Sequence, residues 1–174
     1  LDNRAINVGK RYAKNFKEIK EKGAGLLLFG DVGVGKTFIA ACIVNSVIDQ
    51  GYSAIMSNFS RIINTIQETF DQKQKYLNRL NSVDLMVIDD LAVERKTDYV
   101  KEMVYQIIDS RYRSGKPLIV TTNLTIDNLV NATDISDKRT YHRILEMCTP
   151  LKVEGENLRI KQFLHKRNVN KNET

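Results

Sequence analysis

The 174-residue sequence has no tryptophan, only two prolines, two cysteines and two histidines. Cys42 and Cys148 lie far apart, and neither has a second cysteine or a histidine at the spacing of a metal site. His142 and His165 form no HxxxH or CxxH pattern. We therefore expect two reduced, buried thiols in a reducing compartment, and no metal site built from side chains alone.

Long apolar runs are also absent. The longest of them, residues 25–29, is far too short to cross a bilayer, and basic residues interrupt the start of the chain, where a signal peptide needs an apolar core. These absences predict a cytoplasmic protein without a membrane partner. Because the chain opens at Leu1 rather than at a methionine, we interpret it as a fragment of a longer protein.

Composition and charge leave the function open. Hydrophobic residues make up 42% and charged residues 28%, which excludes disordered and fibrous classes. The net charge of +6, from 27 basic and 21 acidic residues, permits a nucleic-acid partner. It fits a simple need for solubility equally well.

Short apolar segments alternate with amphipathic ones along the chain. This alternation predicts an α/β fold in which helices cover both faces of a parallel sheet. The predicted strands cover residues 25–29, 53–57, 85–88, 118–120 and 151–153. The predicted helices cover residues 4–20, 36–49, 59–70, 97–114 and 136–147, the last with Ser136 as its N-cap. Residues 71–82 fit either a loop or a continuing helix, and residues 166–174 are expected to form a flexible tail.

A glycine-rich turn joins the first predicted strand to the helix that begins at Lys36. Its sequence, GDVGVGKT over residues 30–37, satisfies GxxxxGK[ST] in the strand–turn–helix context that phosphate binding requires. The predicted nucleotide-contacting residues are Gly30, Asp31, Val32, Gly33, Val34, Gly35, Lys36, Thr37 and Phe38. Lys36 would lie along the β- and γ-phosphates of ATP or ADP, and Thr37 would ligate Mg²⁺. A glycine-rich turn without a ligand is the alternative, and the flanking strand and helix disfavour it.

Polar side chains follow two other predicted strands. Asp89 and Asp90 come directly after the strand at 85–88, and Asn123 follows the strand at 118–120. The carboxyl ends of parallel strands meet at one edge of the sheet, where ligands bind. We expect Asp89 to hold Mg²⁺, Asp90 to activate the attacking water, and Asn123 to contact the γ-phosphate. An acidic turn and a turn asparagine are the plainer alternatives.

Four segments taken together, residues 30–37, 85–90, 121–123 and 139–143, resemble the AAA+ ATPases. More narrowly, the chain is similar to the bacterial and phage replicative-helicase loaders of the DnaC/DnaI type, which are related to transposition helper ATPases of the IstB type. This similarity covers residues 3–160. It rests on the runs IDDL at 88–91, DSRY at 109–112, TTNL at 121–124, RILEMC at 143–148 and VEGENLR at 153–159.

The resemblance implies an AAA+ P-loop domain over residues 1–165, with a five-stranded parallel sheet of order 5-1-4-3-2. It implies that Arg143 is an arginine finger, inserted into the nucleotide site of a neighbouring subunit in a ring or spiral homo-oligomer. Arg159 matches the family's second-sensor arginine, which acts in its own subunit. Too few residues follow the fifth strand for a full helical lid, so the lid is expected to be absent or vestigial. The loaders also have an N-terminal region that grips the helicase, and we expect such a region of the native protein to be missing from this chain.

The function that the resemblance implies is delivery of a ring-shaped replicative helicase onto single-stranded DNA during replication initiation, driven by slow ATP hydrolysis. The residues that match the family's DNA-contacting surface, or lie beside it, are Phe70, Arg95, Lys96, Thr97, Tyr99 and Lys101. An aromatic ring beside basic side chains suits single-stranded DNA. Core packing is the alternative for Phe70 and Tyr99.

Three other functions stay open on the sequence. An IstB-type transposition helper would prefer duplex DNA and would recruit a transposase. A small-molecule P-loop kinase would need an arginine-rich lid, and no such segment is present. Because Asp90 is one methylene shorter than the glutamate usual in such ATPases, a nucleotide-gated binding module without useful hydrolysis is also conceivable.

Overall fold

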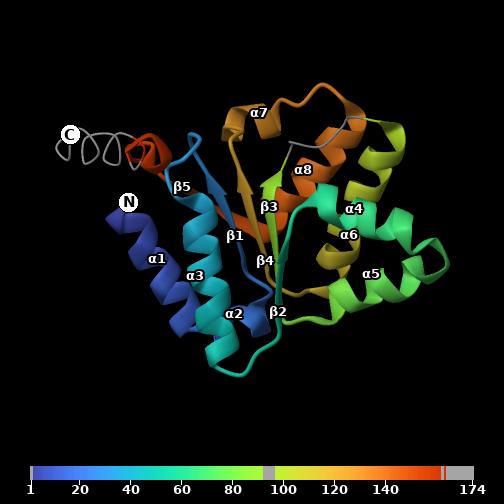
Figure 1. Ribbon diagram of the computed structural model, residues 1–174, viewed down its shortest axis with the longest axis horizontal. Helices are drawn as coiled ribbons and strands as arrows, with labels where there is room; N and C mark the ends of the chain where they lie inside the picture. The colour runs from blue at the N-terminus through green and yellow to red at the C-terminus, as the bar shows by residue number, and fades with distance from the viewer. Residues whose placement is uncertain (1, 92–96, 162, 164–174) are drawn as a thin grey trace, which may run out of the picture.

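The computed structural model describes residues 2–91, 97–161 and 163 of the chain. Five parallel strands form one sheet of order β2-β3-β4-β1-β5 (Figure 1), which confirms the expected order 5-1-4-3-2. The strands are β1 Gly25–Phe29, β2 Ala54–Ser57, β3 Leu85–Leu91, β4 Leu118–Thr122 and β5 Cys148–Lys152.

Helices cover both faces of this sheet. On one face lie α1 Asn3–Lys14, α2 Phe16–Lys22 and α3 Lys36–Asp49. The other face is covered by α4 Phe59–Glu68, α5 Lys73–Ser82, α6 Asp98–Ser114, α7 Ile126–Val130 and α8 Ile135–Met147, and a short 3₁₀ helix, η1 Phe70–Gln72, joins α4 to α5. None of the helices in the described part of the chain is both long and apolar enough to span a membrane.

The central strands are apolar on both sides because each side faces a layer of helices. In β1, Leu27 packs in the core on the α4–α8 face, whereas Leu26 and Leu28 pack in the core on the α1–α3 face. In β3, Met86 and Leu85 divide between the two cores in the same way. This two-sided burial explains why the strands appear in the sequence as continuous apolar runs rather than as an alternation.

Several predicted boundaries were wrong. The helix predicted over residues 4–20 is two helices that meet at Asn15. Ser136 is not the N-cap of α8, because the Asp134 carboxylate accepts the main-chain N–H groups of Ser136 and Asp137. The five-residue helix α7 was not predicted at all, and its first turn is closed by a capping box between Thr125 and Asn128. Residues 71–82, which the sequence left open, are largely helical.

The two cysteines differ in their surroundings. Cys148 is buried in the core, as expected, and this burial raises the pKa of its thiol. Cys42 was expected to be buried and is exposed, whereas Ile39 and Ile43 of the same helix pack into the core on the α1–α3 face. No disulfide joins them.

Candidate nucleotide-binding site

The glycine-rich turn lies between β1 and α3 at the carboxyl edge of the sheet (Figure 1). Gly30 and Gly33 have φ values of +145° and +84°. A Cβ atom at Gly30 would lie 2.3 Å from the carbonyl oxygen of Val153, and one at Gly33 would lie 2.3 Å from Oδ1 of Asn157. Glycine is therefore required twice over, by backbone conformation and by the segment after β5 that packs on the loop.

Lys36 is held across this loop by three hydrogen bonds. Its Nζ donates to the carbonyl oxygens of Gly30 at 2.8 Å and Asp31 at 2.7 Å, and to Oδ1 of Asn123 at 2.6 Å. Burial lowers the pKa of the Lys36 ammonium, and the carboxylate of Asp90 opposes that shift. Asn123, at the end of β4, thus lies beside the glycine-rich loop, where the sequence placed it.

The first acidic residue, Asp89, joins three elements. Its Oδ1 accepts the hydroxyl of Thr37 from α3 at 3.0 Å and the hydroxyl of Thr121 from β4 at 2.6 Å. The sequence placed Asp89 and Thr37 at one metal site, and the structure brings their oxygens together. Thr121 had no assigned role, although it belongs to the TTNL run that carried the resemblance.

A cavity of about 510 Å³ opens beside the loop. Lys36, Thr37, Asp90, Asn123 and Arg159, all predicted site residues, line it. Phe38 and the loop residues Val32, Gly33 and Gly35 also contribute to its wall. The side chain of Val34 instead faces the core on the α1–α3 side. Arg159 follows the segment that covers Gly33, and its positive charge adds to the lowering of the Lys36 pKa.

Arg143 lies elsewhere in the same protomer. It is not among the residues that line the cavity; its Nε is 3.4 Å from Oδ1 of Asp109 and its Nη1 is 3.6 Å from Oε2 of Glu146. The guanidinium carbon lies 4.1 Å from the ring centroid of Tyr112 on α6. Arg143 therefore lies apart from the nucleotide cavity of its own protomer, and its role as a finger stays a prediction.

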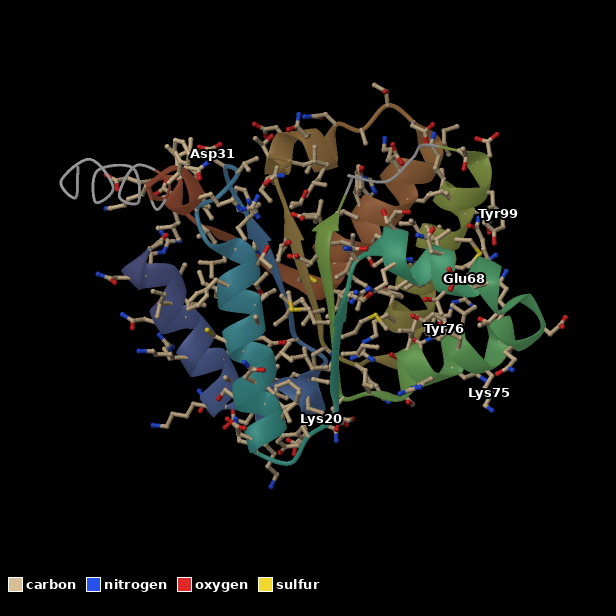
Figure 2. All side chains as sticks on the ribbon, viewed as in Figure 1. Lys20, Asp31, Glu68, Lys75, Tyr76 and Tyr99 are labelled. Atoms are coloured by element: carbon tan, nitrogen blue, oxygen red, sulfur yellow. The ribbon has the colours of Figure 1, made fainter. Side chains whose placement is uncertain are left out.

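Three of the six predicted DNA-contacting residues have described side chains, and all three lie at the start of α6. Thr97 caps α6 by accepting the N–H of Val100. Tyr99 is 45% exposed, so the core-packing alternative for it is wrong, and Figure 2 shows it on the α6 side of the molecule, well away from Asp31. The Lys101 ammonium is paired with Asp134 at 2.6 Å.

Arg95, Lys96 and the side chain of Phe70 lie outside the described residues. The DNA-contacting role of all six residues stays a prediction.

Comparison with known proteins decides the family. The model of the IstB-like ATP binding protein family matches residues 8–166. The chain belongs to this family. Membership identifies the loop at residues 30–37 as the P-loop of an ATP-binding family.

Relatives and solved structures agree with this assignment. The chain is 26% identical over 160 residues to the replicative helicase loader DnaI of Bacillus subtilis (strain 168), covering 85% of this chain and 51% of that protein. It is 29% identical over 144 residues to the replicative helicase loader DnaC of Escherichia coli (strain K12), covering 80% and 56%. The chain thus spans about half the length of these relatives.

Two crystal structures share the fold. The DnaC helicase loader superposes with a TM-score of 0.74 at 28% identity, covering 87% of this chain and 89% of that one. DnaI superposes with a TM-score of 0.72 at 23% identity, covering 88% and 82%. The AAA+ type of P-loop fold implied by the sequence resemblance is confirmed.

Proposed function

We propose that this chain binds ATP together with Mg²⁺ and hydrolyses the ATP to ADP and phosphate. The observation that carries the proposal is the convergence of Lys36, Asp90 and Asn123 on one cavity, with the Thr37–Asp89 pair beside it. These groups come from the P-loop and from the ends of β3 and β4, so the sheet itself sets their spacing.

The residues present fit a magnesium ion. The part of the chain that the structure describes holds no cluster of three or more His, Cys, Asp or Glu side chains that could bind a metal. Mg²⁺ bound with a nucleotide needs no such cluster, because one or two protein oxygens and the phosphates suffice. Thr37 and Asp89 supply two oxygens 3.0 Å apart. When bound there, the ion would neutralise phosphate charge.

Each side chain has a distinct task in this proposal. Lys36 would exchange its carbonyl partners in the loop for phosphate oxygens. Asp90 would orient the attacking water and accept its proton, and Asn123 would hydrogen-bond the γ-phosphate without adding negative charge. Arg159 would act on the nucleotide of its own protomer. Arg143 would reach the nucleotide of a neighbouring protomer, where its planar guanidinium can bind two equatorial oxygens.

The biological role we propose is that of the ATPase domain of a replicative-helicase loader, acting with a replicative helicase and single-stranded DNA as a homo-oligomer. The names of the DnaC and DnaI relatives support this role. A transposition helper is the second candidate, because the matching family is described as IstB-like.

The nucleotide claim is tested by calorimetric titration of ADP into the Lys36→Ala variant. We expect affinity to fall at least about tenfold, since a charge-assisted contact to phosphate is lost. Lys116→Ala is the matched control, because the Lys116 ammonium also donates to main-chain carbonyls, those of Asn81 and Ser82, before the amino end of β4. Equal affinity in the Lys36→Ala variant and in the wild type would contradict the proposal.

The two biological roles are separated by capture experiments on the full-length protein with ATP present. Retention of a replicative helicase and preference for single-stranded DNA support the loader role. Retention of a transposase and preference for duplex DNA support the transposition helper instead.

A further inference from the structure

The two acidic residues lie on an irregular part of the sheet. In the parallel pairing of β3 with β4, Ile88 is opposite Val120, and Leu91 is opposite Thr122. Two residues of β3, Asp89 and Asp90, therefore face one residue of β4, which is Thr121. This two-against-one arrangement is a β-bulge, a feature that re-aims side chains and is common beside functional sites.

The bulge changes where the second acid points. In a regular strand, consecutive side chains such as those of Asp89 and Asp90 face opposite sides of the sheet. Here Asp90 has a φ of +55°, and it is the only non-glycine residue with positive φ in the described ranges. With the backbone turned in this way, Asp90 lines the nucleotide cavity while Asp89 still reaches Thr37. Both carboxylates are thus brought to the same site.

One buried hydroxyl contacts both bulged residues. The Thr121 side chain belongs to a residue with 0% exposure, and its Oγ1 donates to the Asp89 carboxylate at 2.6 Å. The same oxygen accepts the main-chain N–H of Asp90 at 2.9 Å. The Asp90 N–H, displaced from the strand pairing at a part-buried position, is satisfied by this acceptor, and a hydroxyl can serve as donor and acceptor at once.

We infer that Thr121 is the positioning residue for both carboxylates: its hydroxyl fixes the Asp89 oxygen toward Thr37 and holds the Asp90 backbone in its left-handed conformation. Thr121 does not line the cavity, so it acts through the two acids rather than on the nucleotide. The catalytic tasks of Asp89 and Asp90 rest on the proposed function. The hydrogen bonds by which Thr121 positions them do not.

The chain offers closely matched variants. Thr121→Val keeps the shape and removes the hydroxyl, and Thr121→Ser keeps the hydroxyl. Thr122 is the control, because it is equally buried, lies next in the same strand, and also uses its hydroxyl twice. Its Oγ1 donates to the Leu91 carbonyl and accepts the Leu124 N–H, so this hydroxyl serves partners other than the two acids.

The first test needs neither nucleotide nor metal. Hydrogen exchange of the Asp90 amide, followed by NMR, should become at least about tenfold faster in the Thr121→Val variant, because the N–H loses its acceptor. Thr121→Ser and Thr122→Val should leave it near the wild-type rate. An unchanged Asp90 exchange rate in Thr121→Val would overturn the inference. Thr121→Ala replaces the valine variant if the latter does not fold.

The second test measures the Mg²⁺ concentration that half-saturates binding of a non-hydrolysable ATP analogue. We expect Thr121→Val to raise it about tenfold, the usual effect of losing a group that orients a metal ligand. Binding of ADP in EDTA should stay unchanged, and Thr121→Ser should resemble the wild type. If the wild type shows Mg²⁺-dependent binding and Thr121→Val matches it, the inference about Thr121 is wrong and the proposed function still stands. If the wild type shows none, the proposed function fails, and the exchange measurement still decides the role of Thr121.

Discussion

The ammonium of Lys36 lies 2.6 Å from the side-chain oxygen of Asn123, although 87 positions separate the two residues in the sequence. This contact joins the P-loop, which follows β1, to the end of β4, the strand that pairs with β1 in the sheet. A phosphate that draws Lys36 toward itself must therefore compete with Asn123, so the two residues respond to the nucleotide together.

Asn123→Ala should separate binding from hydrolysis. The P-loop and Lys36 remain, so we expect ADP affinity to change by less than about threefold. We expect kcat to fall about 100-fold, because a donor aimed at the reacting phosphate is lost. Steady-state phosphate release and ADP titration measure the two effects, and a loss of affinity as large as the loss of kcat would contradict the assigned role.

Asp90→Asn tests the base. The amide keeps the size of the carboxylate but cannot accept a proton, so hydrolysis should fall about 100-fold or more while nucleotide binding persists. Asparagine also tolerates the left-handed backbone of residue 90, so the fold should be unaffected. Retention of wild-type turnover would assign proton transfer to another group and would remove Asp90 from the mechanism.

Arg111 supports the opposite end of the sheet. It is fully buried, and its guanidinium donates to the carbonyl oxygens of Pro117 (2.6 Å), Val83 (2.9 Å) and Asp84 (2.9 Å). Burial lowers the pKa of Arg111 to about 10, so it stays charged at neutral pH. Arg111→Met leaves these carbonyls without donors and should lower the free energy of unfolding by roughly 3 kcal/mol.

Urea unfolding measures this loss against a neighbouring arginine. The side chain of Arg113 is 75% exposed and is paired with Asp109, so Arg113→Met should change the free energy of unfolding by less than about 1 kcal/mol. Similar values for both variants would mean that the buried guanidinium has no structural role.

Asp84 provides a pH dependence. Burial raises the pKa of its carboxyl, but hydrogen bonds from Lys20 and Ser53 outweigh this and lower the pKa to about 2 from 3.8. A lowered carboxyl pKa stabilises the fold above the unfolded value, and this contribution is lost as the pH falls from about 4 toward 2. Figure 2 shows Lys20 at the end of the sheet far from Asp31, so catalysis should not be involved.

We therefore expect Asp84→Asn to lower the Tm at pH 7 by about 3 °C. The difference from the wild type should shrink through the acidic range and vanish near pH 2. A difference that stays constant from pH 7 to pH 2 would show that the charge of Asp84 does not contribute.

Helices and strands were predicted well where short stretches of sequence, such as apolar runs and glycine-rich turns, determine them. The bounds of β1 and α3 were correct because a two-sided apolar run and a glycine-rich turn define them. The helix α7 was missed because its apolar positions are too few to show a period. Asp134 and Ser136 are both suitable caps by residue type, and only the observed N–H geometry distinguishes them.

Contacts between distant segments could not be predicted in the same way. Lys101 was assigned to a DNA surface, and its ammonium is paired with Asp134, 33 positions away. The role of Thr121 depends on the β3–β4 register, in which one extra residue decides which side chains face each other. The P-loop, by contrast, is a contiguous motif, so its residues were identified from sequence alone.

In the proposed function, two protomers complete one nucleotide site, with Lys36 from one and Arg143 from the other. The most direct test of this arrangement is the ATPase rate of an equimolar mixture of Lys36→Ala and Arg143→Ala proteins. Each variant alone should be inactive, with Arg143→Ala still binding nucleotide, and mixing should restore part of the wild-type turnover. A mixture as inactive as its components, or full turnover by Arg143→Ala alone, would contradict the account.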